Sequence, residues 1–111
     1  MKPPPFDYLR PTTLDEALRM LAQHGDEAKV LAGGQSLVPM MNFRLAAPRL
    51  LIDINRIAAL SGIEVTSDGL RLGALVRWHE LEKSSVVAAH NPLLQAAVRH
   101  IAHFQIRNRG T

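Results

Sequence analysis

The first half of the chain switches between strand-like and helix-like patterns of hydrophobic and polar residues. Residues 6–9 alternate with a period of about two, which predicts a short edge strand. Thr13 and Glu16 form a capping box, and the apolar residues after them recur every three or four positions, which predicts an amphipathic helix ending at Gly25. Residues 29–32 predict a second short strand that runs into a pair of glycines.

A second helix and a third strand complete this half. Ser36 is a candidate N-cap for the helix, and Pro39 is tolerated because it falls in the first turn. We expect the apolar residues of this helix to be core: Met40, Met41 and Phe43. Residues 50–54 form an apolar run typical of a strand buried on both faces. The order strand, helix, strand, helix, strand predicts βαβ units with right-handed crossovers and a small parallel sheet.

The second half begins with a different pattern. Residues 63–66 and 70–73 alternate with a period of two around Ser67-Asp68-Gly69, which predicts an antiparallel hairpin with a positive φ at Gly69. The change from parallel to antiparallel pairing places a lobe boundary between residues 56 and 61. The fold class is therefore α/β (α+β), with an N-terminal lobe over residues 1–55 and the beginning of a second lobe over residues 56–111.

Helical patterns fill the rest of the second half. Residues 78–83 predict a helical turn, and we interpret Trp78 as a packing residue of its lobe. Asn91 as N-cap and Pro92 at the first helical position predict a last helix that reaches about His103.

Composition narrows the class of protein. The 111 residues fit one small domain or two lobes, and 47% hydrophobic with 21% charged residues excludes wholesale disorder. The chain has no cysteine, which excludes disulfides, thiolate nucleophiles and cysteine-held zinc or iron–sulfur clusters within it, and is compatible with a cytoplasmic location. No stretch approaches the roughly 20 apolar residues of a membrane span, and the start lacks a secretory signal.

The positive charge of the chain is concentrated at its end. The formal net charge is +3, and no acidic residue occurs after Glu82. Four cations lie in this stretch: Lys83, Arg99, Arg107 and Arg109. This basic end favours an anionic partner of unspecified kind. Arg107 and Arg109 either contact nucleic acid or form a polar segment packed on a lobe or at a subunit interface, and we favour packing because interleaved aromatics are missing.

The glycine-rich segment has the clearest chemical content. Residues 32–37 (Ala-Gly-Gly-Gln-Ser-Leu) lie where a predicted strand passes into a helix. Glycines there allow amide N–H groups to converge on a phosphate or pyrophosphate, aided by the helix N-terminus and the Ser36 hydroxyl. The segment lacks the spacing of a Gly-x-Gly-x-x-Gly or nucleoside-triphosphate loop. The spacing alone also fits a tight strand-to-helix connection.

Other polar residues carry weaker signals. His100 and His103 have helical i, i+3 spacing, but without a nearby carboxylate or thiolate we expect no metal site. Asp53 ends the buried strand, where it either contacts a sugar or acts as a base, or caps the following turn. No nucleophile–histidine–acid arrangement is indicated, so we predict no catalytic residue.

Three segments carry a family resemblance: residues 29–41 (KVLAGGQSLVPMM), residues 51–54 (LIDI) and residues 105–111 (QIRNRGT). Together they closely resemble the medium, FAD-binding subunits of the molybdenum hydroxylases, of the carbon monoxide dehydrogenase and xanthine dehydrogenase type, which have a PCMH-type FAD-binding fold. The resemblance covers essentially the whole chain, in order.

The resemblance implies particular cofactor-binding residues. The family's first pyrophosphate motif matches a continuous run, in which many members have His in place of Gln35: Ala32, Gly33, Gly34, Gln35 and Ser36. Leu37 follows and is expected to touch the cofactor. Thr111 matches the first residue of the second motif, Thr-Ile-Gly-Gly-Asn.

The resemblance also implies a function. Such a subunit is an oxidoreductase component that carries FAD and relays electrons from the 2Fe-2S clusters of a small subunit, which receives them from a molybdopterin large subunit, to an external acceptor. Because the chain stops one residue into the second motif, we expect a truncated flavoprotein. The alternatives are a non-catalytic remnant that binds no cofactor tightly and, from the basic end, a small nucleic-acid-binding protein.

Overall fold

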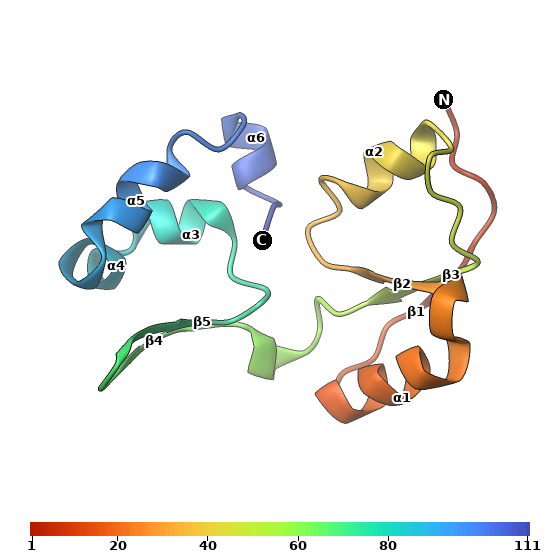
Figure 1. Cartoon of the computed structure of the whole chain (residues 1–111), viewed down its shortest axis with the longest axis horizontal. Coiled ribbons are helices and arrows are strands. Elements are labelled where there is room, and N and C mark those ends of the chain that lie inside the picture. The colour runs from red at the N-terminus through yellow and green to blue at the C-terminus, as the bar shows by residue number, and fades with distance from the viewer. The chain divides into compact units, whose positions relative to one another are not determined.

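A computed structural model describes residues 1–111, which form two compact units. Unit 1 comprises Met1–Ala59 and unit 2 comprises Leu60–Thr111. Figure 1 shows the elements of both units, and each unit is described by itself. None of the helices is long and apolar enough to cross a membrane.

Unit 1 is built on a three-stranded parallel sheet. Its strands are β1 (Asp7–Leu9), β2 (Ala28–Leu31) and β3 (Leu50–Asp53), in the order β1-β3-β2. Every residue of β3 is buried, as its apolar run predicts, because this strand pairs with a neighbour on each side. The predicted parallel sheet with β1 at its edge is confirmed.

Two crossover helices connect these strands. Helix α1 (Leu14–His24) follows β1, helix α2 (Leu37–Asn42) follows β2, and Figure 1 shows them on opposite sides of the sheet. Thr13 Oγ1 accepts a hydrogen bond from Glu16 N–H at 3.2 Å, so the predicted cap of α1 is confirmed. The Glu16 carboxylate reaches back to Thr12 N–H rather than to the cap residue itself.

Helix α2 differs from its prediction in two ways. The Ser36 hydroxyl makes no capping hydrogen bond, because Ser36 has helical dihedral angles and not the extended ones of a side-chain N-cap. Met41 is 2% exposed, but Met40 is 42% and Phe43 is 62% exposed, so the core prediction was right for one residue of the three. Met40 and Met41 are adjacent and so point to different sides of the helix, and Phe43 follows its end at Asn42.

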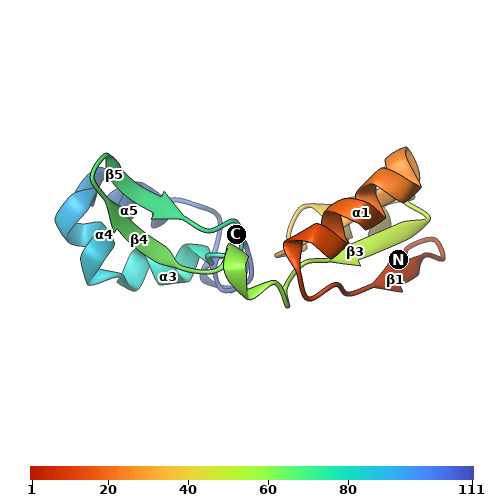
Figure 2. The same cartoon turned by 90° about the horizontal axis from the view of Figure 1, so that it is seen from below.

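Unit 2 contains the predicted hairpin and four short helices. Strands β4 (Ile63–Thr66) and β5 (Gly69–Leu72) pair antiparallel, and Gly69 has φ +141°. The hairpin is seen from a second direction in Figure 2. The helices are α3 (Trp78–Lys83), α4 (Ser85–His90), α5 (Pro92–Val98) and α6 (Phe104–Arg107). Their core is Val76, Leu81, Val87 and Val98, with Trp78 packed against it.

The last helix is shorter than the sequence predicts. Asn91 caps α5 by accepting from Leu94 N–H at 3.0 Å, but the helix ends at Val98 and not near His103. Ala102 has φ +46°, which no α-helix accommodates. His100 and His103 therefore do not share a helix face, and His103 instead precedes α6, an element that the sequence did not predict.

Candidate functional site

The turn between β2 and α2, residues 32–37, is the segment for which the sequence predicts phosphate binding. Gly34 has φ +74°, a conformation that glycine adopts at little cost. A Cβ at Gly34 would lie 3.3 Å from Leu31 Cδ1 and 3.3 Å from Val38 Cγ2. The Gly34 carbonyl accepts a hydrogen bond from Val38 N–H at 3.0 Å. The backbone angle therefore favours glycine here, and a Cβ would require the Leu31 or Val38 side chain to shift by a few tenths of an ångström.

The backbone hydrogen-bond donors of this turn have no acceptor within the protein. None of the backbone N–H groups of residues 33–37 donates to another group of the protein, and the Ser36 hydroxyl has no partner. Gln35 and Ser36 are exposed, and the Gln35 side chain donates to the Gly33 carbonyl at 3.3 Å. Successive unpaired N–H groups in a turn form a concave site for an anion. The α2 helix has only six residues, so these N–H groups contribute more to anion binding than the helix dipole does.

Asn55 connects the start of the turn to β3. Its Nδ2 donates to the Ala32 carbonyl at 2.9 Å and to Asp53 Oδ1 at 2.6 Å. Its backbone N–H donates to the same Asp53 oxygen at 2.9 Å. Asp53 therefore caps the turn that follows β3, which was one of the two predictions for this residue.

The second oxygen of Asp53, Oδ2, is contacted by Tyr8 of β1 and by Arg10, which follows β1. Tyr8 Oη donates to Asp53 Oδ2, and Arg10 Nε lies 3.5 Å from that oxygen. We call Tyr8, Arg10, Asp53 and Asn55 the Asp53 network. Its residues lie where the parallel strands end, so side chains join the carboxyl ends of all three strands.

The Asp53 network changes the ionisation of its members. Burial raises the pKa of Asp53, but the hydrogen bonds from Tyr8 and Asn55 and the charge of Arg10 outweigh burial and lower it below its usual range. The same hydrogen bond, with burial and the Asp53 charge, raises the pKa of Tyr8. Asp53 is thus held as a carboxylate and serves as an acceptor rather than as a general acid.

Thr111, the other predicted cofactor contact, belongs to unit 2. The residue before it, Gly110, is buried, and a Cβ there would lie 2.8 Å from Trp78 Cδ1. Trp78 N–H donates to the Gly110 carbonyl at 3.0 Å, and the Arg77 guanidinium donates to the Arg109 carbonyl. The segment that leads to Thr111 is therefore fixed to the start of α3.

Arg107 organises the loop before this segment. Its Nη1 donates to the Ile101 carbonyl at 3.0 Å and lies within 3.5 Å of the carbonyls of Arg99 and Ala102. Its Nε lies 3.2 Å from Glu82 Oε2, and its side chain is 13% exposed. We call Arg107, Glu82 and these three carbonyls the Arg107 network. Arg107 is therefore engaged inside unit 2, in keeping with the packing interpretation of this basic end.

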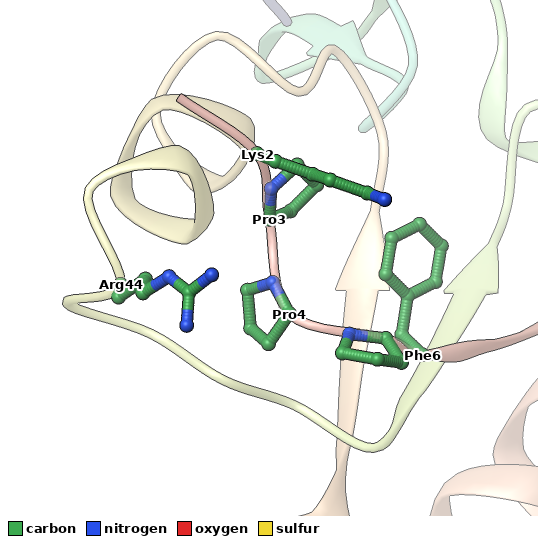
Figure 3. A pocket seen from close by; sticks show the side chains of 6 residues that line it. Lys2, Pro3, Pro4, Phe6 and Arg44 are labelled. Carbon is green, nitrogen blue, oxygen red and sulfur yellow. The ribbon is translucent and has the colours of Figure 1, made fainter.

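A surface pocket lies elsewhere in unit 1. It has a volume of about 520 Å³ and is lined by the N-terminal segment, and Figure 3 shows Arg44 pointing toward Pro3 and Pro4. Its lining residues are Lys2, Pro3, Pro4, Pro5, Phe6 and Arg44. None of residues 32–37 lines it, so this pocket is not the predicted phosphate site. The chain also has no group of three His, Cys, Asp or Glu side chains arranged to hold a metal ion.

Sequence reasoning missed most of the side chains that hold the turn. Tyr8 was interpreted as a strand residue, and Arg10 and Asn55 were not singled out. The available signal was Asp53, a carboxylate at the end of a buried apolar run, because such a group requires donors nearby.

The sequence matches a known family over nearly its whole length. Residues 4–111 match the family described as "FAD binding domain in molybdopterin dehydrogenase". The alpha subunit of the 6-hydroxypseudooxynicotine dehydrogenase complex from Paenarthrobacter nicotinovorans is 50% identical over the whole chain, which spans 38% of that protein. The carbon monoxide dehydrogenase medium chain of Hydrogenophaga pseudoflava is 48% identical, and the chain spans 39% of it.

The fold matches solved structures as well. A structure of carbon monoxide dehydrogenase from Hydrogenophaga pseudoflava superposes with a TM-score of 0.97 at 48% identity, covering all of this chain and 39% of that one. The family resemblance and the mixed α/β fold predicted from the sequence are both confirmed. The chain spans less than two fifths of the relatives it matches.

Proposed function

The chain belongs to the family of FAD-binding domains of molybdopterin dehydrogenases, and we propose that its turn of residues 32–37 binds the diphosphate of FAD. The observation that carries this proposal is the set of unpaired N–H groups over residues 33–37, next to the unpaired Ser36 hydroxyl. A diphosphate supplies several oxygen acceptors for these donors. We propose Leu37 and Thr111 as further contacts on the strength of the family resemblance.

The residues of the turn have separate tasks in this proposal. Gly34 adopts the positive φ of the turn, and Ser36 adds a hydroxyl donor. Gln35 is anchored to Gly33 and is exposed at the rim. FAD, when bound, supplies the redox chemistry, and this chain supplies binding and orientation.

A titration with FAD tests the proposal in the natural full-length protein. Gly34→Ala is expected to weaken FAD binding about tenfold or more, which corresponds to ~1.4 kcal/mol, because the left-handed angle and the tight packing both disfavour a Cβ. Gly25→Ala is the matched control: Gly25 also has a positive φ, but a Cβ there meets nothing within 4 Å. Equal affinity of wild type and Gly34→Ala, or no binding by wild type, would overturn the proposal.

We also propose that the flavin relays electrons from an iron–sulfur small subunit, itself supplied by a molybdopterin large subunit, to an external acceptor. Relatives named as subunits and medium chains of dehydrogenase complexes support this role. Mixing the FAD-loaded protein with its chemically reduced iron–sulfur subunit should bleach the absorption of oxidised flavin. An unchanged flavin spectrum would contradict the relay. The alternative, a remnant that binds no cofactor, is tested by the FAD titration. The cytoplasmic location stays a prediction.

A further inference from the structure

We propose that Asn55, oriented by Asp53, is a positioning residue that orders the turn of residues 32–37 before FAD arrives. This inference rests on the proposed function of that turn. It adds a residue outside the family's glycine motif to the parts that determine FAD affinity.

The turn needs such support because its own backbone provides little. The N–H groups of residues 33–37 make no internal hydrogen bond, and the bond from Val38 N–H to the Gly34 carbonyl lies at the far end of the turn. At the near end, β2 stops at Leu31, whose carbonyl accepts from Ile54 N–H at 3.0 Å. The next carbonyl, of Ala32, is held by Asn55 Nδ2 at 2.9 Å.

Asn55 is itself held in place from two directions. Asp53 Oδ1 accepts from both its backbone and its side chain, which fixes the direction of the amide. Asp53 is 5% exposed, and Tyr8 and Arg10 occupy its other oxygen. A series of contacts thus runs from β1 through the end of β3 to the turn after β2. Ordering the turn in advance reduces the conformational entropy that binding must overcome.

The test compares Asn55→Ala with Thr13→Ala, in the natural full-length protein. Thr13→Ala removes the cap of α1 and lowers global stability, but Thr13 has no contact with the turn. Four quantities are measured for each variant: the global unfolding free energy, the FAD dissociation constant, the phosphorus NMR signal of bound FAD and, without FAD, hydrogen exchange of the Val38 amide, which donates to the Gly34 carbonyl. The phosphorus NMR signal of bound FAD reports the environment of the diphosphate directly.

We expect Asn55→Ala to weaken FAD binding about tenfold, which is ~1.4 kcal/mol, to speed exchange of the Val38 amide and to shift the phosphorus signal. Thr13→Ala should leave the FAD affinity, the exchange of the Val38 amide and the phosphorus signal unchanged at a similar loss of global stability. Unchanged exchange in Asn55→Ala, or equal loss of affinity in both variants, would overturn the positioning role. If wild type binds no FAD, the proposed function fails and so does the assignment to FAD, while faster exchange would still show that Asn55 orders the turn.

Discussion

The two units stabilise their predicted cofactor-contacting segments with groups of opposite charge. In unit 1 the carboxylate of Asp53 accepts from Tyr8 and Asn55, whereas in unit 2 the guanidinium of Arg107 donates to the carbonyls after α5. The difference follows from what the secondary structure leaves unpaired. The loop after α5 presents backbone carbonyls outside any helix or strand, which require a donor. The ends of the parallel strands carry side-chain donors, which require an acceptor.

The largest expected effect is the loss of unfolding free energy caused by a cavity in the core of either unit. Ile52 of β3 and Val98 of α5 are both 0% exposed. Ile52→Ala should reduce the unfolding free energy by about 4 kcal/mol and Val98→Ala by about 2 kcal/mol, because each leaves a cavity in proportion to the atoms removed. Hydrogen exchange should locate the loss in unit 1 for the first and in unit 2 for the second. The same loss of protection in both units from either variant would mean that they unfold as one.

The next largest effect concerns the Arg107 network. Arg107→Ala should cost about 2–3 kcal/mol of unfolding free energy, because it leaves Glu82 and three carbonyls without their donor. Arg107→Lys should recover part of this loss, since it keeps the charge but not the fork of donors. Arg71→Ala, which removes an exposed ion pair with Glu64, is the control and should cost less than about 0.5 kcal/mol. Equal losses for Arg71→Ala and Arg107→Ala, measured by urea unfolding, would contradict an organising role for Arg107.

A smaller effect is expected from the Asp53 network. Tyr8→Phe should lower the unfolding free energy by about 1 kcal/mol, because it removes one hydrogen-bond donor to the Asp53 carboxylate. The loss is small because the Tyr8 side chain is half-exposed. Chemical denaturation of the variant measures this cost, and Asp7→Ala on the same strand, which has no side-chain hydrogen bond, is its control. A cost for Tyr8→Phe no larger than that of Asp7→Ala would show that Asp53 does not depend on Tyr8.

The smallest effect is a dependence of stability on pH that arises from two members of the Asp53 network. The pKa of Asp53 is lowered in the folded state, so its contribution is complete above its unfolded pKa of about 4 and is lost as the pH falls through the folded value. The pKa of Tyr8 is raised, so its contribution is complete below its unfolded pKa of about 10 and is lost as the pH rises through the folded value. Unfolding free energies measured across pH should show both losses. Asp53→Asn should remove the acidic loss, and an unaltered acid limb in that variant would contradict the assignment.

Sequence reasoning predicted the sheet of unit 1 and the hairpin of unit 2 because their signals are local. The apolar run of β3, the cap at Thr13 and the turn at Gly69 each depend on a few neighbouring residues. The predicted end of α5 was wrong because Ile101 continues the apolar spacing. In the structure the Ile101 carbonyl instead accepts from Arg107, six residues further along the chain. Such a contact leaves no periodic trace in the sequence.

The candidate site was predicted in a similarly uneven way. The glycine turn was found because Gly33-Gly34 lies between a strand pattern and a helix pattern, and the family resemblance gave it a ligand. The side chains that hold the turn were not found, because Tyr8 and Asp53 are 45 residues apart and meet only when the sheet forms. The capping role of Ser36 was wrong for a related reason, since dihedral angles and not residue type determine whether its hydroxyl reaches an N–H group.

The packing of Trp78 against Gly110 gives the molecule a built-in optical probe. Trp78 is the single tryptophan of the chain, and its indole ring would be only 2.8 Å from any Cβ at position 110. Its fluorescence therefore reports on unit 2 without any label, at the place where the core meets the segment that leads to Thr111.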